Sequence, residues 1–336
     1  MSAESQTWLD ANILVGMTAQ RGNAWHRLAG GNNTFDGPVP IERVRELLTR
    51  YAAEEVAMEY TDTHKVIPGV KAIRRIDTHD LYKVFSDGYQ SHDYNAWLVD
   101  KVGDLLDEVP GDLGIANAGG LNNGAVAFVQ IETPESFKAA MGVEFRPNIT
   151  AVTSLNGRFA TTYKWMFTNV VCDNTLSMGI AEAALQAKFK HTSKSIGNIR
   201  KVRGDLALGF INDAADAFAA EVDALMSVKV TDSDWSKFLD LHVELTDAKG
   251  EPLKGRGLTL REHEREDLTQ LRDNDLMCAP WRDYAFGVIQ TVNTYDQWTS
   301  IVRGKERTER NMYNALAGKT AALDATTRDQ IMSIVG

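Results

Sequence analysis

The sequence predicts an α+β protein, with an antiparallel β-sheet and packed helices in the N-terminal part and a mostly helical C-terminal part. Two Asn-Gly pairs, Asn123-Gly124 and Asn156-Gly157, each separate runs of strand-forming residues. Asn-Gly favours the type I′ turn of antiparallel hairpins. From Ser195 onward, apolar residues recur mainly at helical spacing. An apolar fraction of 43% in 336 residues is enough for a substantial core.

We expect three parts along the chain. Residues 1–37 form an N-terminal arm that is polar and rich in Gly and Asn, with a turn cluster at 30–37. Residues 38–230 form the α+β core domain, and residues 231–336 form a helical C-terminal region.

The core domain begins with a helix over 38–53, because Pro40 suits a first turn and the apolar side chains that follow keep helical spacing. A second helix over 94–106 is expected to be capped by Asp93. The inward residues of the first helix are Val44, Leu47, Leu48 and Tyr51.

Strands occupy most of the remaining core domain. The turn at 77–80 separates the first two, and the Asn-Gly pairs separate the other four. The expected strands are 71–76, 81–85, 115–118, 125–131, 149–153 and 158–167.

The last of these strands divides its side chains between two faces, because neighbours alternate across a strand. One face carries an aromatic row, which is either part of the core or a binding platform. Its members are Phe159, Thr161, Tyr163, Trp165 and Phe167. The other face carries Arg158, Ala160, Thr162, Lys164 and Met166.

Helices dominate the rest. Asp173 or Asn174 is expected to cap a helix that includes Leu176, and residues 188–191 are expected to be extended. Pro280 is expected to open a further helix. The other predicted segments are a helix over 195–227, a loop over 249–255 and two short helices around Leu316 and Ile331.

Composition and motifs exclude several classes of protein. There is neither an apolar run of membrane-spanning length nor a signal peptide, so we expect a cytoplasmic protein that does not engage a membrane. Two cysteines rule out a disulfide framework. No phosphate-binding loop or nucleophile elbow is present, and we expect no cofactor and no catalysis.

Charge is distributed unevenly, although the net charge is −10. Residues 185–204, called the basic run here, contain six Lys or Arg and no acid, whereas residues 205–250 contain ten acids and three Lys. The basic run is either a phosphate-binding surface or a solvated face that pairs with an acidic neighbour. Its candidate contacts are Lys188, Lys190, His191, Lys194, Arg200, Lys201 and Arg203.

Four residues near the second Asn-Gly pair could extend such a surface. Arg158 and Lys164 would add cations, and the rings of Tyr163 and Trp165 would stack on bases if their strand face is exposed. A metal site formed by Asp77, His79 and Asp80 is a weaker alternative, because turns favour Asp for backbone reasons alone.

Several segments of the chain resemble the phage/plasmid-like proteins, a family defined only as a domain of unknown function. The resemblance is collinear over roughly residues 22–320, and its most specific stretch is Val-Val-Cys-Asp-Asn-Thr-Leu at 170–176. The other similar segments are 22–26, 75–77, 81–89, 295–298 and 303–310. The chain departs from the family pattern at Ala24 and at 155–157.

This resemblance implies a mobile-element setting in a host cytoplasm and a part in DNA metabolism. We therefore expect a bacteriophage-type, non-catalytic protein that binds nucleic acid, preferably single-stranded DNA, as in annealing or DNA recombination. Pairing of the basic run with an acidic segment of a second copy would give a homo-oligomer. The alternatives are a protein-interaction module that engages a host factor and a metal-dependent nuclease.

Overall fold

A computed structural model of the chain describes all residues except 1–10, 22–32, 109–110, 112, 134–135, 140, 170–174, 177–185, 190–203, 277 and 304–305. The chain divides into two compact units. The sheet unit comprises Met1–Glu135, Pro147–Met166 and Ala184–Ala214. The helical unit comprises Ser136–Arg146, Phe167–Ala183 and Ala215–Gly336.

An antiparallel sheet forms the centre of the sheet unit. Its longest run of neighbouring strands includes β1-β5-β6-β8-β9, and β11 also pairs with β9. These strands are β1 (Ile13–Val15), β5 (Gly114–Leu121), β6 (Val126–Glu132), β8 (Glu144–Ser154), β9 (Thr161–Asn169) and β11 (Gln186–Phe189). The predicted antiparallel sheet is therefore confirmed.

One face of this sheet packs on two helical segments to form the core. The segments are α3 (Ile41–Thr49) and the pair η1 (Asn95–Val99) and α4 (Asp100–Glu108); a short helix, α2 (Thr18–Arg21), precedes them. Their buried residues join strand residues such as Val129 and Ile149 in one cluster. The prediction for Asp93 is confirmed, since its carboxylate accepts a hydrogen bond from the backbone N–H of Asn95.

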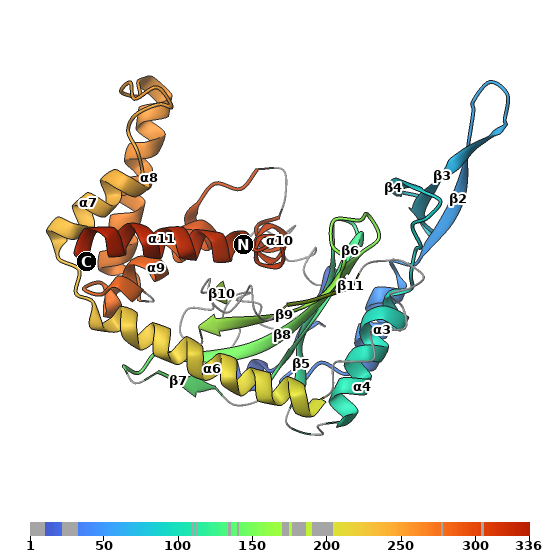
Figure 1. Cartoon of the computed structure of the whole chain (residues 1–336), viewed down its shortest axis with the longest axis horizontal. Coiled ribbons are helices and arrows are strands. Elements are labelled where there is room, and N and C mark those ends of the chain that lie inside the picture. The colour runs from blue at the N-terminus through green and yellow to red at the C-terminus, as the bar shows by residue number, and fades with distance from the viewer. Residues whose placement is uncertain are drawn as a thin grey trace. The chain divides into compact units, whose positions relative to one another are not determined.

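A second, three-stranded antiparallel sheet has the order β2-β3-β4. Its strands are β2 (Ala53–Glu59), β3 (Val66–Arg75) and β4 (Leu81–Ser86). The hairpin of β2 and β3 extends away from α3 and α4 as a long arm (Figure 1). Its base is tied to the core by Ile73, which is fully buried.

The helical unit contains most of the remaining elements. They are α7 (Asp232–His242), α8 (Gly255–Asn274), η3 (Ala279–Trp281), α9 (Ala285–Thr294), η4 (Tyr295–Thr299), α10 (Arg307–Leu316), α11 (Lys319–Val335) and the short strands β7 (Phe137–Lys138) and β10 (Thr175–Leu176). The helix α6 (Gly204–Ser227) begins in the sheet unit and ends in the helical unit. Every residue of α9 is buried, and α11 packs on both α9 and α7. The predicted helical C-terminal part is confirmed.

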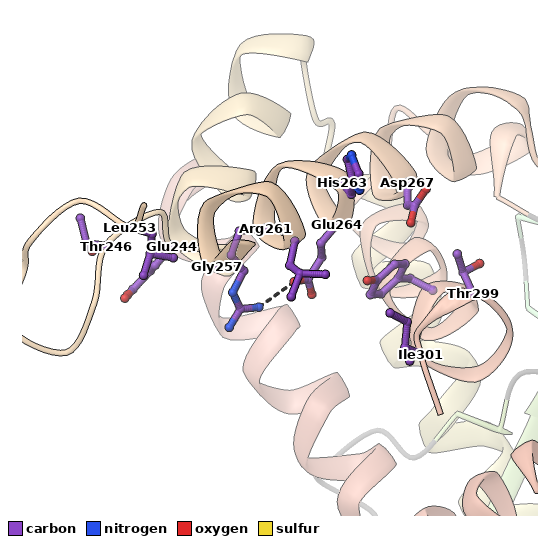
Figure 2. Close-up of a pocket in the computed structure, with 12 residues that line it drawn as sticks. Glu244, Thr246, Leu253, Gly257, Arg261, His263, Glu264, Asp267, Thr299 and Ile301 are labelled. Carbon is purple, nitrogen blue, oxygen red and sulfur yellow. Dashed lines mark hydrogen bonds and ion pairs between the residues drawn. The ribbon is translucent and has the colours of Figure 1, made fainter. Parts of the chain in front are cut away.

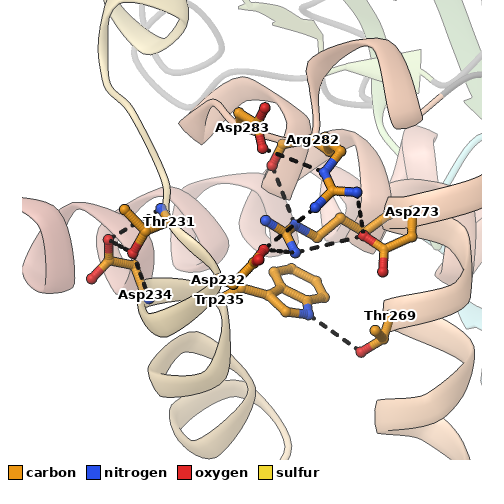
Figure 3. Close-up of polar contacts among 9 residues, drawn as sticks. Thr231, Asp232, Asp234, Trp235, Thr269, Asp273, Arg282 and Asp283 are labelled. Atoms are coloured by element: carbon orange, nitrogen blue, oxygen red, sulfur yellow. Dashed lines mark hydrogen bonds and ion pairs between the residues drawn. The ribbon is translucent and has the colours of Figure 1, made fainter.

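A buried arginine, Arg272, joins three elements of the helical unit, and its neighbours Asp232 and Trp235 are labelled in Figure 3. The Arg272 guanidinium lies 3.0 Å from the Asp232 carboxylate, donates to the carbonyl of Arg282 and lies over the Trp235 ring. Thr231 and Asp234 form a capping box at the start of α7, so the helix that carries Asp232 begins at a fixed position.

Replacing Arg272 by Gln should destabilise the helical unit by about 2 kcal/mol, because the part-buried carbonyl of Arg282 loses its donor and Trp235 loses a packing partner. Urea unfolding followed by circular dichroism measures this. Lys237→Gln is the matched control, since that Lys pairs with Asp234 in a largely exposed position and should change stability by less than about 0.5 kcal/mol. Equal effects of the two changes would contradict the assignment.

Three local predictions were wrong. Asn156-Gly157 does not form a two-residue turn, because β8 and β9 are joined by residues 155–160, which Ser154 closes through hydrogen bonds to Phe159. Thr175 and Leu176 are in a strand rather than a helix, where they pair with Thr168 and Phe167. Pro280 opens only the short η3, and the helix proper begins at Ala285.

Within the described ranges, none of the helices has the length and apolar character that crossing a membrane requires.

Candidate functional site

Most of the predicted phosphate contacts cannot be placed. Lys190, His191, Lys194, Arg200, Lys201 and Arg203 lie outside the described residues. The backbone of Lys188 is described: it belongs to β11, at the register position opposite Thr162 of β9. The prediction that this part of the chain is extended is therefore confirmed at Lys188 and Phe189.

The four other candidates differ in exposure. Arg158 is exposed in the loop between β8 and β9. Tyr163 is 3% exposed and belongs to the core cluster, so the exposed ring that its stacking role requires is not present. Lys164 is also buried, with 7% of its surface exposed. The backbone of Trp165 lies in β9, and its side chain is outside the description.

The sheet face opposite the apolar core carries a row of buried polar side chains. Cross-strand register aligns Asn117 with Gln130, Gln130 with Thr150, and Glu132 with Asn148. Side chains opposite each other in a sheet lie on one face. Thr162 and Lys164 follow on β9, alternating with the core residue Tyr163.

Two hydrogen bonds each join a pair of side chains within this row, as burial of polar groups favours. The Asn117 amide donates to Gln130 over 2.6 Å, and the Thr150 hydroxyl donates to Asn148 over 3.1 Å. Glu132 and Asn148 are fully buried. Alternating polar residues are normally expected to face water, so no sequence pattern indicates that this face is buried.

A second polar group surrounds Arg75, which is itself buried. Its guanidinium donates to the Asp77 carboxylate, to the Asn123 side-chain oxygen over 2.8 Å and to the Arg50 carbonyl over 3.2 Å. It also lies 5.2 Å from the centre of the Tyr51 ring. Hydrogen bonding to Arg75 holds the pKa of Asp77 below its usual range. Arg75 therefore links the end of α3, the base of β3 and the β5–β6 turn.

This arrangement removes the predicted metal site. Asp77 pairs with Arg75, Asp80 accepts from Thr78 and Asn123, and His79 lies 4.0 Å from Glu54. No group of three or more His, Cys, Asp or Glu in the described part of the chain is positioned for a metal ion. The nuclease alternative loses the residues on which it depended.

The helical unit contains a pocket of about 660 Å³, within the range typical of ligand sites. Figure 2 shows it between the 244–253 segment, α8 and the segment after α9. One stripe of α8 faces it, because residues three or four apart share a helix face. The lining residues are Glu244, Thr246, Leu253, Gly257, Leu260, Arg261, His263, Glu264, Asp267, Tyr295, Thr299 and Ile301.

The pocket lining combines apolar walls with an excess of acid. Three carboxylates line it against a single guanidinium, and Arg261 lies 2.6 Å from Glu264. Burial, together with the charges of Glu264 and Asp267, raises the pKa of Tyr295 to about 12. The Tyr295 side chain is therefore a neutral phenol at physiological pH. Sequence reasoning missed this pocket, and only the helical spacing of its α8 residues could have indicated it.

Neither the curated proteins nor the solved structures compared with the chain include a match. A family model does match, over residues 81–317, which is most of the chain. That range includes β4, the central strands β5, β6, β8 and β9, and the helical elements as far as α10. The chain therefore belongs to the family described as Domain of unknown function (DUF932).

Proposed function

We propose that this chain is a nucleic-acid-binding protein of phage- or plasmid-type DNA metabolism, which holds single-stranded DNA through its basic run without cleaving it. The observation that carries the proposal is the pairing of β11 with β9. It supports the proposal because it fixes the start of an acid-free cationic segment at a strand of the central sheet. Lys and Arg that neutralise phosphates supply most sequence-independent affinity.

The burial of Tyr163 and Lys164 limits how such binding would work. Without stacking on Tyr163, affinity comes chiefly from charge, so binding should depend steeply on salt and weakly on base sequence. The exposed Arg158 adds one cation. The resemblance to phage/plasmid-like proteins supports the mobile-element setting in a host cytoplasm. Pairing of the basic run with an acidic segment of a second copy would assemble the protein on the strand.

Replacing Lys188, Lys190 and Lys194 together by Gln should weaken binding to a fluorescent oligothymidylate. The slope of log affinity against log salt should fall by about 2, since each lost contact with a single strand contributes roughly 0.7. Fluorescence anisotropy across a salt series measures the affinity and its dependence on salt. The matched control replaces the exposed Lys237, Lys249 and Lys254 of the helical unit by Gln. Affinity that does not respond to salt, or equal losses in both triple variants, would refute the proposal.

A second candidate is a protein-interaction module that engages a host factor through the helical unit. The observation that favours it is the pocket, because Ile301 and Leu260 in its lining are 70% and 42% exposed. Exposed apolar side chains beside a concave surface are typical of interaction sites. Retention of one defined protein by the immobilised chain, undiminished by nuclease treatment, would support this candidate, and loss of retention on nuclease treatment would contradict it.

A further inference from the structure

Hydrogen bonds hold the elements that line the pocket of the helical unit in place. Its floor is α8, and the 244–253 segment is closed by paired backbone contacts between Asp247 and Glu251 and between Leu245 and Leu253. Arg265 fastens the base of this segment to α8 through two hydrogen bonds to the Val243 carbonyl.

The opposite wall is the π-helical turn η4, which carries Tyr295 and Thr299. Side chains of α10 hold this turn: Asn311 donates to the Gln297 carbonyl over 2.9 Å, and Arg307 donates to the carbonyl of Ser300, the residue after η4, over 2.8 Å. Single π-helical turns occur frequently at functional sites. Side chains that hold such a turn in place keep the pocket open without a ligand.

The charges of the pocket define what it accepts. Arg261 pairs with Glu264, whereas Glu244 and Asp267 have no ion-pair partner within the described ranges. The pocket therefore presents uncompensated negative charge, which repels phosphate and attracts a cation. Tyr295, a neutral phenol whose ring also lines the pocket, adds a surface that favours cations.

A bare ammonium ion would leave the apolar part of the lining uncovered, so it is not the ligand that fits the pocket best. Leu253, Leu260 and Ile301 line the pocket together with the charged groups, and Ile301 is largely exposed. A cation on an apolar stem, with apolar neighbours, would cover these side chains and bring its charge to a carboxylate of the lining. Within a protein chain, Arg and Lys have this character.

We propose that this pocket binds an arginine or lysine side chain, flanked by apolar residues, from a segment of a partner protein. The inference deepens the second candidate function and is independent of nucleic-acid binding. The acidic lining favours the cationic group, and the exposed apolar side chains favour the apolar residues that flank it.

A fluorescein-labelled, amidated peptide Leu-Arg-Leu-Arg tests the proposal by anisotropy against the full chain. The double variant Glu244→Gln/Asp267→Asn should weaken binding about fivefold to tenfold, as expected for two partly screened charge contacts. The matched control, Glu262→Gln/Glu266→Gln, removes the same charge from exposed positions of α8 outside the lining and should stay within twofold. The variant Ile301→Ser should weaken binding of the peptide about threefold.

Three results would contradict the proposal that the pocket binds a cationic side chain. Absence of binding to the full chain, or equal weakening by the two double variants, overturns the proposal. Arginine amide that competes as well as the peptide would also overturn it, since the flanking apolar residues would then contribute nothing. If the peptide fails but a partner is still retained by the pocket variants, the interaction function stands and the pocket assignment falls.

Discussion

Replacing Gly287 by Ala should destabilise the helical unit by about 3 kcal/mol or more, the upper end of what overpacking costs. A Cβ at this position would lie 1.9 Å from the Trp281 carbonyl oxygen and 2.5 Å from its carbon. These are backbone atoms, and the same oxygen accepts the Tyr284 N–H over 3.0 Å. Relief of the clash therefore requires opening η3 or displacing α9, which is buried along its whole length.

Urea unfolding followed by tryptophan fluorescence measures this effect, because Trp235 and Trp281 are both buried in the helical unit. Gly257→Ala is the matched control: it makes the same change in α8, where a Cβ meets nothing within 4 Å. That variant should be neutral or more stable by up to about 1 kcal/mol, since Ala favours a helix. A Gly287→Ala protein as stable as the control would show that η3 and α9 are less tightly packed than the structure indicates.

Local signals predicted the parts of the fold that local chemistry decides. Asn123 and Gly124 both have positive φ, of 55° and 82°, and their turn joins β5 to β6. The apolar spacing of α3 gave its buried residues, since Val44, Leu47 and Leu48 are all in the core. In these elements, turn propensity and burial favour the same conformation.

The errors arose where tertiary contacts override a local pattern. Asn156-Gly157 has the same propensity as the first pair, but only Gly157 has positive φ, and the Ser154 side chain closes a longer loop instead. Alternation from Gln130 to Glu132 indicates a solvated strand face, yet both residues are buried. A sequence pattern shows which side chains of a strand are polar. It does not predict which face of the strand is covered by another part of the chain.

The candidate sites show the same limit. The basic run could be recognised from composition because its charges are adjacent in sequence. The pocket joins residues from Glu244 to Ile301 that come from three separate segments. Its acidic character depends on which carboxylates Arg261 pairs with, and this follows only from the packing.

The sheet unit should lose stability as pH rises above about 10. Burial is the leading cause that raises the pKa of Tyr51 to about 12 and those of Tyr94 and Tyr163 above their ordinary value. In the unfolded chain these phenols ionise near pH 10. Because their pKa values are higher in the folded chain, these phenols stay protonated there at pH values at which the unfolded chain has already lost the protons. The free energy of unfolding is therefore unaffected below about pH 10 and falls as the pH rises above it. For Tyr51 alone the loss reaches about 2 kcal/mol at pH 12.

Tyr94→Phe separates this titration from general alkaline unfolding. The Tyr94 hydroxyl donates to the Gly124 carbonyl over 2.7 Å, so the variant should lose about 1 kcal/mol at pH 7. It should nevertheless lose less than the wild type between pH 9.5 and 11.5, because one buried phenol no longer titrates. Tyr60→Phe is the control, since that ring is 50% exposed on the β2–β3 arm and meets water in both states. Urea midpoints at each pH measure the effect. An alkaline loss that is identical in Tyr94→Phe and Tyr60→Phe would mean that groups other than the core tyrosines govern it.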